Sequence, residues 1–202
     1  MISQELLGVV LCGGQSYRMG SDKALLKTGD QTWVEQSIQL FSKVNIPVVL
    51  SINRDQEAAH VQRSSIKAIT DNTSIHVKGP LLGLLTIHQA HPDKDLFVLA
   101  CDLPNMNAEV IKELCDKYSE DQGRQAYVFA NEDGYEPLCA IYTSVGLTKI
   151  EGLRKQGKLQ KFSMKYVLDL MDTAVYPLPH EWKRYFTNVN TPEELNNLQF
   201  KR

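Results

Sequence analysis

Residues 6–23 read LLGVVLCGGQSYRMGSDK, and this stretch decides the fold class. It begins with a short, valine-rich apolar run over 6–11, which predicts a buried β-strand. The run ends at Gly13-Gly14, where two glycines let the backbone approach a ligand and turn its amide groups toward it. Arg18 and Lys23 add two positive charges to the same loop. Amide donors and cations together favour a phosphate group, so the stretch predicts a strand followed by a phosphate-binding loop.

The loop differs from two common phosphate-binding motifs. It is not a Walker A loop, because no Gly-Lys-Ser/Thr follows four residues after a glycine. The glycines at 13, 14 and 20 also miss the G-x-G-x-x-G spacing of dinucleotide-binding proteins. The alternative interpretation is a flexible connection with solvated charges. The combination of the glycine pair with Arg18 and Lys23 favours the phosphate interpretation.

Strand and helix patterns alternate through the first 120 residues. This alternation predicts a Rossmann-like, three-layer α/β/α fold with a mostly parallel twisted sheet. Buried strands are expected at 6–11, 47–52, 66–70 and 96–100, and helices at 33–44, 57–63, 79–91 and 108–118.

The rest of the chain is more polar and less regular. Strands are expected at 125–130, 135–142 and 174–177, with one or two short helices within 153–168 and a further helix starting at Thr191. Proline is poorly tolerated in a central ladder, so Pro137 is placed where the paired part of its strand begins. The sequence contains no repeat, low-complexity segment or linker, so we expect one domain.

Acidic residues follow two of the expected parallel strands. Such sheets bind ligands beyond the carboxyl ends of their strands, near the point where the strand order reverses. Asp102 follows the fourth strand, and Mg²⁺ prefers one or two carboxylates together with phosphate oxygens. A turn-capping role is the alternative for Asp102. Asp71 follows the third strand, and we weigh ligand contact there against a local Asx-turn.

Composition excludes several classes of protein. The 202 residues carry a formal net charge of −2, whereas nucleic-acid binding needs a dense Lys/Arg surface. The N-terminus lacks the features of a secretory signal, and no apolar run approaches the ~18 residues of a membrane helix. The four cysteines fit no zinc pattern, so we expect reduced thiols in a cytoplasmic protein. Cys12 and Cys101 both end strands and are expected to flank the same site.

The motifs together resemble the molybdenum cofactor guanylyltransferase family, the bacterial MobA proteins, within the nucleotidyltransferases that share the nucleotide-diphospho-sugar transferase fold. The family usually has alanine at Cys12, a departure that should not matter where the backbone binds. Five segments carry the resemblance, nearly from end to end: 11–23, 79–83 (GPLLG), 101–104 (CDLP), 136–142 (EPLCAIY) and 186–195 (FTNVNTPEEL).

This resemblance implies transfer of GMP from GTP to the terminal phosphate of molybdenum-molybdopterin, with release of pyrophosphate. It implies residues 1–120 as a nucleotide-binding half and residues 121–202 as an acceptor half. By position, Lys23, Arg18 and Asp102 would be catalytic, and Asp102 would hold Mg²⁺. The nucleotide would contact a larger set: Leu11, Cys12, Gly13, Gly14, Lys23, Asn53, Asp71 and Asp102. Asn188 and Asn190 would lie on the pterin side, where Asn190 has a helix-capping role as its alternative.

Two other functions remain to be weighed. A related nucleotidyltransferase would use CTP or another phosphorylated acceptor, such as a sugar phosphate. A non-catalytic module would bind nucleotide and pass molybdopterin to a partner. Besides its substrates, an enzyme of this family is expected to contact molybdopterin-carrying proteins or molybdoenzymes transiently, and neither nucleic acid nor membrane.

Overall fold

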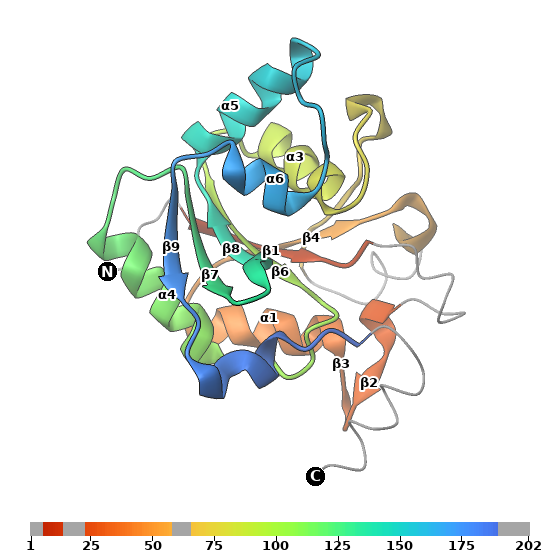
Figure 1. Cartoon of the computed structure of the whole chain (residues 1–202). Helices are drawn as coiled ribbons and strands as arrows, with labels where there is room; N and C mark the ends of the chain where they lie inside the picture. Colours follow the sequence, from red (N-terminus) through yellow and green to blue (C-terminus); the bar gives the residue numbers. More distant parts are fainter. Residues whose placement is uncertain (1–5, 14–22, 58–65, 190–202) are drawn as a thin grey trace.

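A seven-stranded, mostly parallel sheet forms the centre of the computed structural model, which describes residues 6–13, 23–57 and 66–189 (Figure 1). Every neighbouring pair is parallel except the two pairs made by β8. The spatial order is β5 (Ala68–Thr70), β4 (Val48–Ile52), β1 (Leu6–Leu11), β6 (Asp95–Ala100), β8 (Gly134–Tyr142), β7 (Ala126–Asn131) and β9 (Thr173–Pro177). A separate hairpin pairs β2 (Lys27–Thr28) with β3 (Gln31–Thr32).

Helices cover both faces of the sheet, which gives the three layers that the alternating pattern predicts (Figure 1). One face carries α1 (Trp33–Lys43), α4 (Ala108–Glu120) and the 3-10 segment η5 (His180–Phe186). The other carries α3 (Pro80–Ala90), α5 (Ser144–Lys155) and α6 (Met164–Asp169). Within the described segments, no helix is both long enough and apolar enough to cross a membrane.

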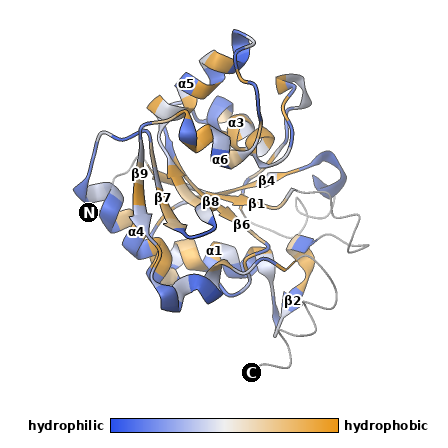
Figure 2. Ribbon diagram, viewed as in Figure 1, coloured by the Kyte–Doolittle hydropathy of each residue, from blue (hydrophilic) through white to orange (hydrophobic). Residues whose placement is uncertain are grey.

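The first strand is buried on both sides, which explains its continuous apolar sequence. Leu6 and Val10 pack into the core beneath α1 and α4, whereas Leu7 and Val9 pack into the core beneath α3. The hydropathy colouring shows the apolar strands enclosed between helices whose polar residues face outward (Figure 2). Residues 6–11 therefore fix the middle of the fold.

Local signals in the sequence begin the main helices. Thr32 and Glu35 form a reciprocal capping box at the start of α1, which satisfies two backbone donors. The side chain of Asn107 caps α4, and α3 begins with Pro80, whose missing N–H costs nothing at the first helical position.

The order of the strands reverses beside β1. The chain passes from β1 to β4 and β5 on one side, and then returns through α3 to β6 on the other side of β1. The loops that leave β1 and β6 therefore separate at the carboxyl edge of the sheet. This is where ligands bind in sheets of this type.

The second half of the chain departs from the sequence prediction at two places, the position of α5 and the start of pairing in β8. Helix α5 covers Ser144–Lys155, largely before the predicted 153–168 segment, and α6 follows Gly157 as a separate short helix. Pairing of β8 with β7 already begins at Gly134, ahead of Pro137, and a register shift accommodates the proline. Pairing of β8 with β6 does begin just after Pro137, at Cys139. The predicted elements at 57–63 and from Thr191 onward lie outside the described residues or at their edge.

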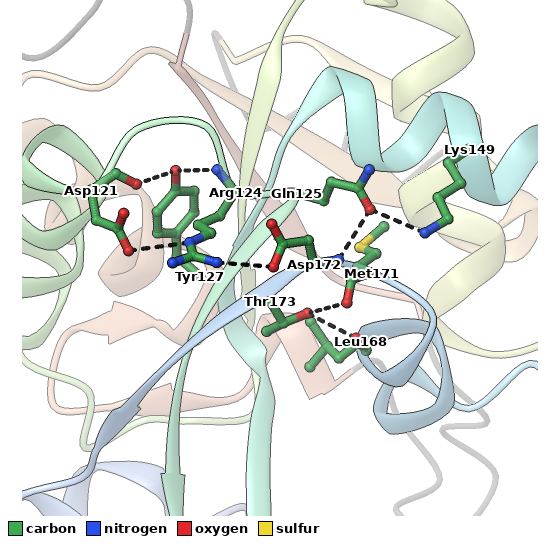
Figure 3. Close-up of polar contacts among 9 residues, drawn as sticks. All are labelled: Asp121, Arg124, Gln125, Tyr127, Lys149, Leu168, Met171, Asp172 and Thr173. Carbon is green, nitrogen blue, oxygen red and sulfur yellow. Dashed lines mark hydrogen bonds and ion pairs between the residues drawn. The ribbon is translucent and has the colours of Figure 1, made fainter.

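A polar network joins the starts of β7 and β9 (Figure 3). Arg124 Nη1 donates to Asp172 Oδ1 at 3.1 Å, and the backbone N–H of Asp172 donates to Gln125 Oε1. The Tyr127 hydroxyl donates to the carbonyl of Asp121. These contacts hold the edge strand β9 beside β7 and leave the carboxyl edge of the sheet free for the site.

Candidate active site

The sequence-predicted residues gather at the carboxyl edge of the parallel strands. In the sheet register Leu11 lies opposite both Ser51 and Ala100, and Ile52 lies opposite Thr70. The residues that follow these strands are therefore neighbours in space: Cys12, Gly13, Asn53, Asp71 and Asp102. The prediction that four separate loops form one edge is confirmed.

Gly13 lies against the residues expected to contact a nucleotide. A Cβ atom placed on Gly13 would lie 3.5 Å from Asp71 Oδ2 and 3.8 Å from the backbone nitrogen of Asn53. Gly13 is itself exposed, so the first loop begins as an open backbone beside a carboxylate. This arrangement brings one end of the glycine loop and the ends of β4 and β5 together.

Asp71 is held from the opposite side by Ser51 and α3. The Ser51 hydroxyl donates to Asp71 Oδ1 at 3.1 Å. A Cβ atom on Gly83 would lie only 2.3 Å from Ser51 Oγ and 3.4 Å from Asp71 Oδ1. These two polar side chains therefore pack directly against the backbone of α3 at Gly83.

Asp71 does not form the local Asx-turn that was its alternative role. Asn72 makes the turn instead, because its side chain accepts from the backbone N–H of Ser74. Burial raises the pKa of Asp71 to about 6, although the hydrogen bond from Ser51 acts in the opposite direction. Within the described part of the chain, Asp71 Oδ2 has no hydrogen-bond partner and faces Gly13.

Gln56 connects the first loop to the end of β4. Its Nε2 donates to the carbonyl of Cys12 at 2.9 Å, and its Oε1 accepts from the backbone N–H of Asn53 at 3.0 Å. Asn53 Oδ1 in turn accepts from the backbone N–H of Gln56, which begins the 3-10 segment η3 (Arg54–Gln56). Gln56 thus fixes the backbone on both sides of the candidate nucleotide site.

Lys23 and Asp102 form an ion pair where the strand order reverses. Lys23 Nζ lies 3.8 Å from Asp102 Oδ2, and their side chains are only 16% and 22% exposed. The Lys23 ammonium also donates to the carbonyl of Val189, whose own N–H donates to the carbonyl of Asp102. Residues from the start, middle and end of the chain therefore meet at one point.

Asp102 has the environment of a carboxylate that needs a further partner. Its Oδ1 is buried and makes no hydrogen bond with the residues that the structure describes. Burial raises the pKa of Asp102, while the nearby Lys23 ammonium lowers it in part. An unpartnered, buried carboxylate oxygen beside a predicted phosphate loop fits a divalent cation, which prefers oxygen ligands. Among the described residues, no group of three or more metal-ligating side chains is present.

A cavity of about 230 Å³ lies beside this ion pair. It contacts the site through Leu103, which follows Asp102, and through Asn188, which precedes Val189. Its other wall comes from the start of β8, including Glu136, and from Lys165 of α6. Asn188 is exposed and lines this cavity.

Comparisons with known proteins identify the family of this chain. A family model described as the MobA-like NTP transferase domain matches residues 8–169, which is most of the chain. The chain belongs to the MobA-like NTP transferase family. The resemblance inferred from the motifs is therefore confirmed, and the chain is a nucleotidyltransferase.

Relatives of this nucleotidyltransferase match over nearly their whole length. A probable molybdenum cofactor guanylyltransferase from Flavobacterium johnsoniae is 28% identical over 195 residues, covering 96% of this chain and 97% of the relative. One from Opitutus terrae is 30% identical over 195 residues, covering 94% and 92%. The crystal structure of molybdopterin-guanine dinucleotide biosynthesis protein A from Archaeoglobus fulgidus has a TM-score of 0.76, 23% identity and 96% coverage of both chains.

Three residues of the predicted nucleotidyltransferase site lie outside the described residues: Gly14, Arg18 and Asn190. Their roles stay predictions. All four cysteines are buried, and Cys12 and Cys101 do lie at the carboxyl edge.

Sequence reasoning missed several residues that shape the nucleotidyltransferase site. Gln56 stands three positions after Asn53, which is the spacing of a capping box and a signal that identifies it. Ser51 and Val189 give no comparable signal, because one is a polar residue inside a strand and the other acts through its backbone. Glu136 lies in a quoted motif, but its side chain received no role.

Proposed function

We propose that this chain transfers GMP from GTP to the terminal phosphate of molybdenum-molybdopterin, which forms the guanine dinucleotide cofactor and releases pyrophosphate. The observation that carries the proposal is the Lys23–Asp102 pair, placed where the strand order reverses and beside the glycine loop. The names of the Flavobacterium and Opitutus relatives support the choice of substrates.

Lys23 supplies positive charge to the triphosphate. Phosphoryl transfer depends chiefly on positioning and on neutralising charge that develops on phosphate oxygens. The ammonium group is anchored by the carbonyl of Val189 and by Asp102, so it is already oriented when the nucleotide binds. Together with Arg18, it would steady the pyrophosphate as it leaves.

Asp102 would hold a divalent cation, which we take to be Mg²⁺. Its buried Oδ1 is the oxygen that a cation would complete. When bound, the cation would supply positive charge that reduces the repulsion between the two phosphate-bearing substrates. Asp102 itself serves two groups, since its Oδ2 faces the Lys23 ammonium.

The nucleoside would lie over Gly13, Asn53 and Asp71. Asp71 Oδ2 faces Gly13, and a carboxylate there accepts hydrogen bonds from the amine, amide or hydroxyl groups of guanosine. A glycine in the first loop also leaves room for the exocyclic amine of guanine. Cytidine also carries an amine and hydroxyls that Asp71 could bind, so it is the glycine that supports GTP over CTP as the substrate.

The same proposal assigns one substrate to each half of the chain. Residues 1–120 would hold the nucleotide and residues 121–202 the acceptor, with Asn188 and Asn190 on the pterin side. A cytoplasmic location also belongs to the proposal, because the free, buried thiols of Cys101, Cys115 and Cys139 suit a reducing compartment.

One assay tests the proposal. The protein is incubated with Mg²⁺, molybdenum-molybdopterin and either GTP or CTP, and the dinucleotide product is measured. We expect the guanine dinucleotide and pyrophosphate in equal amounts. A clear preference for CTP would overturn the assignment of guanine as the base. Nucleotide binding without any product would favour a non-catalytic module that passes molybdopterin to a partner.

A further inference from the structure

The cavity beside the ion pair owes its position to the antiparallel direction of β8. Leu99 of β6 pairs with Cys139, so the residues of β8 that precede Cys139 continue beyond the carboxyl end of β6. That end is where Asp102 stands. Glu136 and Pro137 are thus carried past the end of β6 and line the cavity with Leu103 and Asn188.

Glu136 presents one free carboxylate oxygen in this cavity. Its Oε1 accepts from Asn131 Nδ2 at 2.9 Å, which fixes the orientation of the carboxyl plane. Its Oε2 makes no hydrogen bond with any residue that the structure describes. This oxygen is not one of the buried polar atoms that lack a partner. Burial raises the pKa of Glu136, so the carboxylate is held in a place where its charge is poorly solvated. Such a group gains from a ligand that brings N–H donors.

A lysine closes the far side of the same cavity. Lys165 Nζ donates to the carbonyl of Asp133 at 2.8 Å and passes over Gly134, where a Cβ atom would lie 3.1 Å from that nitrogen. Gly134 has φ +107°, a conformation that favours glycine. Helix α6 is thereby fastened to the β7–β8 turn, and the wall that contains Glu136 is held in place.

The chemistry of the acceptor matches this cavity. The pyrimidinone edge of a pterin carries an amide N–H beside an exocyclic amine, and a carboxylate accepts from both at once. The phosphate of the same molecule has to reach the Lys23–Asp102 centre, which adjoins the cavity through Leu103 and Asn188. A pocket that carries Glu136 beside the reacting centre therefore suits the ring of the acceptor.

We propose that Glu136, oriented by Asn131, is the specificity-determining residue that binds the N–H donor edge of the acceptor's pterin ring. This inference rests on the proposed function and names a residue to which the family resemblance assigned no role. On this arrangement the nucleoside lies over β5, β4 and β1, and the acceptor ring lies over β8, on the opposite side of Asp102.

The test uses Glu136→Gln, which keeps the size of the side chain and the bond from Asn131 but cannot accept from two parallel donors. We expect the KM for molybdenum-molybdopterin to rise about 10–100-fold, the loss for charge-assisted hydrogen bonds of this kind. The Kd for GTP, measured without acceptor, should stay within about twofold, because the change removes no nucleotide contact. Asp169→Asn is the matched control, since Asp169 is exposed on α6 and lies outside the cavity lining.

The outcomes separate this inference from the proposed function. A wild-type protein that forms no dinucleotide would overturn both. A wild-type protein that forms it, with an unchanged acceptor KM in Glu136→Gln, would overturn the role of Glu136 alone. A fall in Tm with proportional loss of GTP binding would mean that Glu136 is structural. Glu136→Asp, which keeps the charge but shortens its reach, should give an intermediate acceptor KM if the carboxylate makes the contact.

Discussion

The hydroxyl of Ser51 donates a hydrogen bond to the carboxylate of Asp71 across 3.1 Å, and the backbone of α3 at Gly83 closes over both groups. This small packed unit places a charged group in a partly buried position at the nucleotide side of the site. Burial of the Asp71 carboxylate lowers the stability of the fold, whereas the same carboxylate is proposed to bind the nucleotide. The first two predictions test this packed unit.

Asp71→Asn should stabilise the fold and weaken nucleotide binding. The pKa of Asp71 is about 6 in the native state against 3.8 for the unfolded chain, so the native state holds its proton longer as pH rises. The free energy of unfolding therefore falls as pH rises from about 4 to 6, because Asp71 becomes charged while buried. It stays lower at every pH above about 6. We expect Asn to raise the free energy of unfolding at pH 7 by roughly 1–2 kcal/mol, allowing for partial exposure.

Unfolding curves of the wild type and Asp71→Asn at pH 4, 5, 6 and 7 check this expectation. The difference between them should grow with pH and then level off above pH 6. GTP affinity should fall in the same variant. A difference in stability that does not depend on pH would contradict the assignment.

Gly83→Ala should destabilise the protein by about 1–3 kcal/mol, the usual cost of overpacking. The new methyl group would lie 2.3 Å from Ser51 Oγ and 3.2 Å from Leu11 Cδ2, so Ser51 and Asp71 must move. Thermal unfolding measures the loss. The double variant Ser51→Ala/Gly83→Ala should recover part of it, because the closest atom is then gone. Gly152→Ala is the control, since a Cβ atom there meets nothing within 4 Å.

Gln56→Ala should lower both stability and GTP affinity. It leaves the carbonyl of Cys12 and the N–H of Asn53 without this partner, and loss of buried hydrogen bonds costs about 1–3 kcal/mol. Gln56→Glu separates the two contacts, since it still accepts from Asn53 but no longer donates to Cys12. Equal GTP affinity in all three proteins, measured by calorimetry, would show that the first loop does not need this support.

Lys23→Ala should reduce turnover by about 10²–10³-fold or more with little change in Tm, because the ammonium group acts on charge in the transition state. Lys27→Ala is the control, because Lys27 is an exposed lysine on β2. Near-normal turnover in Lys23→Ala would remove this residue from the mechanism.

Asp102→Asn should weaken the dependence of turnover on Mg²⁺. The amide keeps the shape of the side chain but loses the charge that would hold a cation, so more Mg²⁺ should be needed to reach half-maximal rate. Rates are measured over a Mg²⁺ titration, beside Asp93→Asn as a control at an exposed turn. An unchanged titration would place the metal on another residue.

Patterns that act within a few residues made much of the fold predictable. The apolar runs at 6–11 and 96–100 predict buried parallel strands, and the structure places both at the centre of the sheet. The parallel direction then forces Cys12, Asn53 and Asp71 to one edge, which is why their proximity could be predicted from the sequence.

Features that depend on contacts between distant segments could not be predicted. Helix α5 has weak amphipathic patterning, and the position of Pro137 depends on a register shift between two strands. The contact between Ser51 and Gly83 arises from how closely α3 packs on the sheet. The cavity at Glu136 requires the antiparallel direction of β8, which no local pattern specifies.

The bond between Lys23 and Val189 spans 166 positions of the sequence. During synthesis the glycine loop emerges from the ribosome first, but the carbonyl that orients its lysine emerges only after residue 189 has been added. A nascent chain therefore has no complete Lys23–Asp102–Val189 cluster until translation of the described region is finished.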